Sequence, residues 1–186
     1  MAEPIYAVAR LAGVQMPGYQ AVENSAETLA LEKEIRKFLN SFDWKNASDY
    51  EKAVHIARRV NQAEYDSTLP SCSLSYGCLV DGKAVCDGFV NAACLLAWCV
   101  DLQATSVSSL AANHSYTAYC INGIWVRHEA TSHDESFHIM DPQNDKFKDE
   151  CGVFGVFANK PIDVASINYY GLLLFNIEDK KVLVLQ

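Results

Sequence analysis

The sequence lacks the features that mark membrane proteins and nucleic-acid-binding proteins. No apolar run reaches the roughly 18 residues of a membrane-spanning helix. Positive charge is scarce, because 15 Lys and Arg residues stand against 23 Asp and Glu residues and leave a net charge of −8. An acidic surface of this kind repels phosphate backbones. We therefore expect neither a membrane nor a nucleic acid as partner.

The N-terminus also lacks a basic segment followed by a long apolar core, which is the pattern of a secretory signal peptide. We therefore expect a cytoplasmic location, or a secreted one if a leader has been removed. Internal repeats and low-complexity tracts are absent as well. Since 50% of the 186 residues are hydrophobic and 20% are charged, we expect one globular domain, with or without a short appendage.

Closely spaced metal ligands are missing too. The chain has seven cysteines, but none forms a Cys-x-x-Cys pair, which is the usual spacing of a structural zinc site. His128, His133 and His138 cluster along the chain, and we interpret them as loop residues rather than metal ligands. We expect no metal and no cofactor. Cys94, Cys99 and Cys120 lie in apolar patterns typical of small buried side chains.

Helical periodicity dominates the first half of the chain. The expected helices run from Asn24 or Ser25 to about Leu39, from Ser48 to about Ala63, and over residues 86–100. Ser48 and Glu51 form a capping box. The helix over 86–100 is apolar on nearly every side, which is typical of a core helix. Residues 1–23 show no clear period, and residues 65–84, rich in Ser, Gly, Pro and Asp, are expected to form a long loop.

The second half of the chain changes to strand patterns. Strands are expected over 104–110, 114–121, 124–128, 151–157 and 169–185. Asn122-Gly123 predicts a type I′ hairpin turn, and the polar residues 132–150 predict a loop. The fold class is therefore α+β, with N-terminal helices, a central helix and an antiparallel sheet. We divide the chain into an extension (1–23), a catalytic domain (24–140) and C-terminal strands that complete or cover the sheet (141–186).

Cys86 differs from the other cysteines in its surroundings. It lies between a turn-like Asp-Gly-Lys and the start of the helix expected over 86–100. The partial positive charge at a helix N-terminus favours a thiolate over a thiol, and a backbone N–H there faces a developing oxyanion. Gly82 and Gly88 are expected to leave the backbone open to a substrate. Cys86 is therefore the candidate nucleophile.

A base and a carboxylate flank the expected hairpin. His114 begins one strand and Glu129 follows the other, so the turn at Asn122-Gly123 brings these two residues together across the ladder. In enzymes with a thiol or hydroxyl nucleophile, a histidine takes the proton of the nucleophile and a carboxylate orients the imidazole. Cys86, His114 and Glu129 are therefore predicted to meet in one site.

The segments around these residues resemble the transglutaminase-like (transglutaminase/protease) superfamily in its bacterial form. HSYTAYCINGIWVRHEAT (114–131) matches the pattern His-Ala-Trp, a strand, Asp-Gly-x-Trp-Tyr, a strand and Asp-x-Thr. YGCLVDGKAVCDGF (76–89) matches Leu-Val-x-Gly-x-x-Val-Cys-x-Gly-Tyr around the nucleophile. EKAVHIARRV (51–60) is similar to the helix before the catalytic loop. The resemblance spans residues 48–134.

This resemblance implies a papain-related fold in which Cys86, His114 and Glu129 are the catalytic triad. The family's oxyanion helper lies upstream of the nucleophile, and Tyr76 is its candidate here. The departures from the family pattern are Glu129 in place of Asp and Tyr116 and Ser132 in place of Trp. The calcium-binding parts of animal transglutaminases are not recognisable in this sequence, so the resemblance also gives no reason to expect a metal.

A second resemblance concerns the C-terminal part. DKFKDECGVFGVFANKPIDVASINYYGL (145–172) is similar to the N-terminus of glutamine phosphoribosylpyrophosphate amidotransferase, where a short propeptide precedes Cys-Gly-Val-Phe-Gly. Cys151 matches the cysteine that becomes the N-terminal nucleophile there, with Glu150-Cys151 as the processing bond. The rest of the chain is far too short for a glutaminase domain, so we interpret this segment as sheet strands. A processed or autoinhibitory segment stays an alternative.

The sequence thus predicts a cysteine acyl-transfer enzyme that acts on peptide or side-chain amides of a protein or peptide substrate. Without a calcium apparatus, hydrolysis by a protease or deamidase is favoured over crosslinking. The alternative is a binding module that keeps the fold and the three residues but turns over no substrate.

Overall fold

The structure, a computed structural model, describes residues 4–13, 24–109, 114–140 and 145–147. Its helices are α1 (Pro4–Leu11), α3 (Ala26–Leu39), α4 (Asp49–Val60) and α5 (Cys86–Cys99), with a π-helical turn η1 (Gly77–Asp81) and a 3₁₀ turn η2 (Ala130–Ser132). Its strands are β1 (Glu64–Tyr65), β2 (Lys83–Ala84), β3 (Ala104–Ser109), β4 (His114–Ile121), β5 (Ile124–His128), β6 (His138–Ile139) and β7 (Asp145–Phe147).

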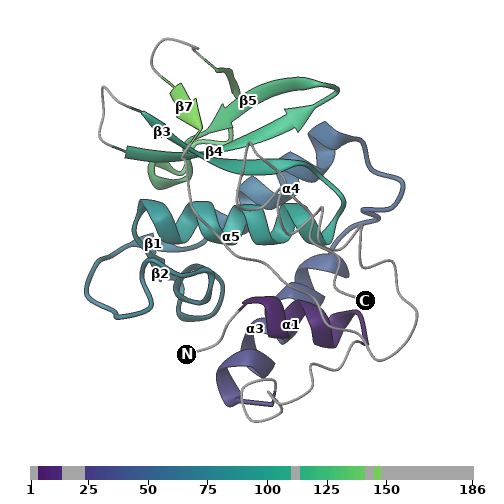
Figure 1. Cartoon of the computed structure of the whole chain (residues 1–186), viewed down its shortest axis with the longest axis vertical. Coiled ribbons are helices and arrows are strands. Elements are labelled where there is room, and N and C mark those ends of the chain that lie inside the picture. The colour runs from purple at the N-terminus through teal and green to yellow at the C-terminus, as the bar shows by residue number, and fades with distance from the viewer. Residues whose placement is uncertain (1–3, 14–23, 110–113, 141–144, 148–186) are drawn as a thin grey trace, which may run out of the picture.

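One antiparallel sheet and the central helix organise these elements. The five strands follow the order β6-β5-β4-β3-β7, and every neighbouring pair is antiparallel. In Figure 1, α5 lies directly beneath this sheet, and α1 and α3 lie beyond α5 from the sheet. The predicted α+β class, with N-terminal helices and a central helix that begins at Cys86, is confirmed.

Local capping signals set the starts of the two N-terminal helices predicted from the sequence. The Ser25 hydroxyl accepts a hydrogen bond from the Thr28 N–H at 3.2 Å, so Ser25 rather than Asn24 caps α3. The capping box at Ser48 and Glu51 is confirmed, because each side chain binds the backbone N–H of the other residue.

The core lies among α3, α4, α5 and the sheet. The buried members include Leu31 and Ile35 of α3, Ile56 of α4, Phe89 and Leu96 of α5, and Tyr119 of β4. Each large apolar side chain removed from water contributes about 1.5–3 kcal/mol. Because α5 is apolar on nearly every side, it packs against the sheet and the helices at once, and this fixes its first residue relative to the strands.

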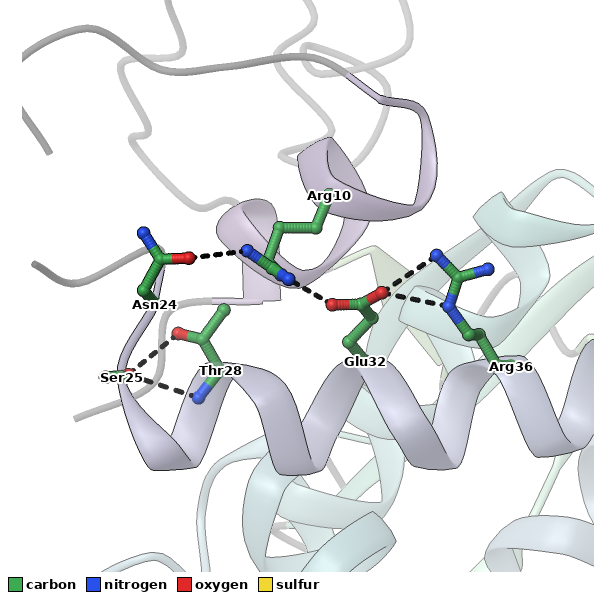
Figure 2. A network of polar contacts seen from close by, with 6 residues as sticks. All are labelled: Arg10, Asn24, Ser25, Thr28, Glu32 and Arg36. Atoms are coloured by element: carbon green, nitrogen blue, oxygen red, sulfur yellow. Dashed lines mark hydrogen bonds and ion pairs between the residues drawn. The ribbon is translucent and has the colours of Figure 1, made fainter. Parts of the chain in front are cut away.

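Helix α1 was not expected from the sequence. Eight residues are too few to show a clear period, and α1 is held by tertiary contacts. Tyr6 and Ala7 are buried, and the Arg10 guanidinium donates to the Glu32 carboxylate of α3 at 2.6 Å. Figure 2 shows that Glu32 lies between Arg10 and Arg36, which donates to the other carboxylate oxygen.

Two expected loops contain short regular elements. Within 65–84, η1 forms and β2 pairs with β1 in parallel, while β6 and β7 form within 132–150 and pair with β5 and β3. Strands of two or three residues depend on the neighbouring strand for their hydrogen bonds, so sequence periodicity does not reveal them. The strands expected over 151–157 and 169–185 lie outside the described residues.

A membrane-spanning helix is not found in the described part of the chain, where every helix is too short or too polar to cross a bilayer.

Candidate active site

Cys86 is the first residue of α5, and a loop backbone supports this helix start. The preceding residue, Val85, is extended, and its N–H donates to the Cys72 carbonyl at 2.9 Å. A Cβ atom added to Gly88 would lie 2.1 Å from that same carbonyl oxygen. Gly88 is therefore needed for the close approach of the Cys72 backbone, and the expectation that it leaves room for a substrate is wrong. Cys86 itself stays half-buried and is a free thiol.

The hairpin formed by β4 and β5 places His114 beside Glu129. Asn122 and Gly123 have φ angles of 52° and 81°, which agrees with the predicted type I′ turn. The ladder pairs Thr117 with His128, so the residues that follow β5 lie opposite the start of β4. The Nε2 atom of His114 lies 2.7 Å from Oε2 of Glu129, and these side chains are 22% and 26% exposed.

Thr131 completes the hydrogen bonding of this pair. Glu129 caps η2, and its Oε1 atom accepts a hydrogen bond from the Thr131 N–H at 2.8 Å. The Thr131 hydroxyl also donates to Oε1 and lies 3.2 Å from Nε2 of His114. In the sequence, Thr131 stands out only as the threonine of the Asp-x-Thr match, and its contacts with both His114 and Glu129 are visible only in the structure.

Aromatic contacts hold the other side of the imidazole. The Tyr116 ring lies edge-on to His114 with a centroid distance of 5.1 Å and an interplanar angle of 86°. The Arg127 guanidinium lies over the Tyr116 ring, 5.1 Å from its centroid. Tyr116, which stands where the resembling family has Trp, therefore still supplies an aromatic wall to the histidine.

The start of α5 and the end of the hairpin lie close together. Phe89, one turn after Cys86, is edge-on to His133 with ring centroids 6.5 Å apart, and His133 follows η2 directly. In the described part of the chain His114 is hydrogen-bonded to Glu129 and Thr131 rather than to Cys86. Hydrogen bonds between catalytic groups often tighten only when a substrate is bound.

Tyr76 lies immediately before η1 and packs its ring against the core. Burial raises the pKa of its phenol, and the nearby carboxylates of Asp81 and Glu27 raise it further. The role of Tyr76 as an oxyanion donor stays a prediction. Cys151 lies outside the described residues.

Two other thiols are in different surroundings. Burial raises the pKa of Cys78 to about 12, and that of Cys99 to about 12 as well. Cys78 is 1% exposed and its Sγ lies 3.8 Å from the Val60 carbonyl oxygen. Both cysteines are therefore protonated and unreactive at neutral pH.

The three clustered histidines have separate partners. His128 contacts the Asp134 carbonyl at 2.7 Å, His133 contacts the Ala63 carbonyl at 3.1 Å, and His138 contacts the Ser136 hydroxyl at 2.9 Å. Among the residues that the structure describes, no group of three or more His, Cys, Asp or Glu side chains is arranged to hold a metal ion.

Comparisons with known proteins give a distant likeness to solved structures. No family model matches the chain, and no curated protein matches it. The solved structures that resemble it include calcium-bound LapG of Legionella pneumophila, with a TM-score of 0.40 and 10% sequence identity over 90% of this chain and 97% of that one. At this level the likeness assigns neither a family nor an activity to the chain.

Proposed function

We propose that this protein is a cysteine-dependent hydrolase of peptide or side-chain amides, with Cys86 as nucleophile, His114 as base and acid, and Glu129 as the carboxylate that orients His114. The observation that carries the proposal is the 2.7 Å contact between His114 and Glu129, at the end of the hairpin, where Phe89 of α5 meets His133. A central helix that starts at a cysteine, followed by antiparallel strands that bear a histidine and a carboxylate, also supports a transglutaminase-like core.

The contact with Glu129 assigns different tasks to the two ring nitrogens of His114. Because Nε2 is occupied by the carboxylate, Nδ1 is the nitrogen that takes the proton of the Cys86 thiol. The thiolate then attacks the carbonyl carbon of the amide, and a tetrahedral oxyanion forms. The first backbone N–H groups of α5 have no partner within the helix, so they can donate to this oxyanion.

The reaction is completed by two successive proton relays through His114, the first carrying the thiol proton to the leaving amine and the second carrying a water proton back to Cys86. The imidazolium of His114 protonates the leaving amine through Nδ1, the C–N bond breaks, and a thioester remains on Cys86. Water then gives a proton to Nδ1 and attacks the thioester, which releases a carboxylic acid and restores the thiol. Glu129 stabilises the imidazolium in both halves of the reaction. We propose water as the acceptor, and it can reach the site because His114 and Glu129 are partly exposed to solvent.

Mass spectrometry of a protein substrate tests this proposal. An unfolded protein is incubated with the enzyme in the presence of a free primary amine, and each product class has its own mass signature. A cut backbone indicates a protease, conversion of Gln to Glu indicates a deamidase, and an incorporated amine indicates crosslinking activity. We expect one of the two hydrolytic products.

The controls separate catalysis from folding. Cys86→Ala and His114→Ala should abolish the product, whereas Cys120→Ala and His138→Ala, which change a thiol and an imidazole outside the site, should not. A folded wild-type protein that yields no product from peptide or side-chain amides would contradict the proposal and favour the binding module.

A further inference from the structure

The hydroxyl of Thr131 lies between two members of the proposed triad. It contacts Oε1 of Glu129 on one side and Nε2 of His114, 3.2 Å away, on the other. The remaining oxygen of the carboxylate, Oε2, also contacts Nε2 at 2.7 Å. Nε2 therefore has two oxygen neighbours, one from each residue.

The directions of these hydrogen bonds follow from a count of protons. An ionised carboxylate only accepts hydrogen bonds, and a threonine hydroxyl has one proton to donate. The Thr131 hydroxyl gives that proton to Glu129, so it faces His114 with a lone pair. Both neighbours of Nε2 are then acceptors, and the arrangement is satisfied only if Nε2 carries a hydrogen.

We propose that Thr131 is a positioning residue that fixes the tautomer of His114, with the proton on Nε2 and with Nδ1 left as the base. This inference rests on the proposed function, because it specifies how the same site is prepared for proton transfer. Without the hydroxyl, Glu129 still offers Oε2, but the second acceptor beside Nε2 is lost and Oε1 loses one of its two donors.

Variants at position 131 can remove the hydroxyl without removing the backbone hydrogen bond that holds the loop. Oε1 of Glu129 also accepts the Thr131 N–H at 2.8 Å, as the cap of η2. This backbone bond persists when the side chain at 131 is replaced. Thr131→Val keeps the β-branched shape and removes only the hydroxyl, whereas Thr131→Ser keeps the hydroxyl and removes a methyl group.

The first test is ¹⁵N NMR of protein labelled on histidine, with the His114 signals assigned by their loss in His114→Gln. We expect wild type and Thr131→Ser to hold the neutral ring with hydrogen on Nε2, and Thr131→Val to show a mixture of both tautomers. Thr131→Ala is measured beside Thr131→Val, so that a folding defect in one variant does not hide the result. An unchanged tautomer in these variants, or a wild-type ring with hydrogen on Nδ1, would overturn the inference.

A matched control is available on the same loop. The Ser136 hydroxyl contacts Nε2 of His138 at 2.9 Å, away from the site. Ser136→Ala should change the His138 signals and leave those of His114 as they are. A change at His114 in Ser136→Ala would mean that the tautomer responds to general loosening of the loop, and this would also count against a specific role of Thr131.

Kinetics supply the second test. Thr131→Val should lower kcat about tenfold with little change in KM, because the hydroxyl acts on proton transfer and not on substrate binding. In a Glu129→Gln background the same substitution should have no further effect, since the hydroxyl acts through that carboxylate. Equal losses in both backgrounds would contradict the inference.

The two proposals fail in different ways. Absence of any amide turnover in the wild type, with the NMR results as expected, would remove the proposed function and leave the positioning role of Thr131 standing. Amide turnover in the wild type that is unaffected by Thr131→Val would remove the positioning role of Thr131 and leave the proposed function standing.

Discussion

Glu129→Gln is the substitution that examines the site most sharply, because it removes a charge and keeps the shape of the side chain. During the reaction His114 becomes an imidazolium, whose Nε2 lies 2.7 Å from Oε2 of Glu129. Opposite charges 4 Å apart attract by about 4 kcal/mol at an effective dielectric constant of about 20. The side chains are 22% and 26% exposed, so water screens part of this attraction, and we take about 3 kcal/mol as the loss. This corresponds to a decrease in kcat of roughly 100- to 200-fold.

Glu129→Asp is the companion variant, because it keeps the charge and shortens the reach. The carboxylate retreats by one carbon–carbon bond, about 1.5 Å, while η2 and Thr131 stay in place. A displacement of about 1 Å in a catalytic group costs about 100-fold. We therefore expect Glu129→Asp to lose nearly as much activity as Glu129→Gln.

The assay is steady-state amide hydrolysis, with thermal unfolding measured on both variants to show that they are folded. If Glu129→Gln keeps its kcat within threefold of the wild type, the carboxylate does not stabilise the imidazolium. If Glu129→Asp is fully active, the length of the glutamate is not what brings it to His114.

The remaining predictions concern the framework of the site. Gly88→Ala should destabilise the protein by about 2–3 kcal/mol in urea unfolding, because its Cβ would lie 2.1 Å from a backbone oxygen; a change below 0.5 kcal/mol would contradict the close approach. Glu32→Gln should lower the free energy of unfolding by about 2 kcal/mol, and the α1 amides should be the first to lose protection from hydrogen exchange. The reason is that hydrogen bonds from Arg10 and Arg36 hold the pKa of the Glu32 carboxyl below its usual range, although burial opposes its ionisation. Burial lowers the pKa of His128, so below about pH 6.5 the unfolded chain binds more protons than the folded one, and the free energy of unfolding should decline towards the lowered folded-state pKa. His128→Gln should remove this decline in urea unfolding, and an unchanged dependence of the unfolding free energy on pH would refute the reasoning.

The parts of the fold that local sequence determines could be predicted. Ser25 and Ser48 cap helices through their own side chains, and Asn122-Gly123 adopts the positive φ angles that a type I′ turn requires. The uniformly apolar pattern of α5 indicated a core helix, and the helix begins at Cys86. The juxtaposition of His114 and Glu129 then follows from the register of a single hairpin.

The parts that depend on distant contacts could not be predicted. α1 is held by a salt bridge to Glu32, 22 residues away from Arg10, and no periodicity in eight residues announces such a contact. The edge strands β6 and β7 are short and depend on β5 and β3 for their hydrogen bonds. Gly88 has a packing role that only the position of the Cys72 carbonyl reveals.

The role of Thr131 illustrates the same limit within the site. Its spacing from Glu129 is visible in the sequence, but the direction of its hydrogen bonds depends on where the imidazole lies. That position depends on the hairpin register and on the contact with Tyr116.

The claim that Cys86 is an activated nucleophile is tested most directly by brief, limiting treatment with iodoacetamide at about pH 6, followed by peptide mapping. Ordinary thiols react slowly at this pH because only the thiolate is nucleophilic, and Cys78 and Cys99, whose pKa values burial raises to about 12, should stay unlabelled. We predict that Cys86 is alkylated first and that His114→Ala removes this preference. Labelling spread evenly over the accessible cysteines, or a preference for Cys86 that persists in His114→Ala, would contradict the account.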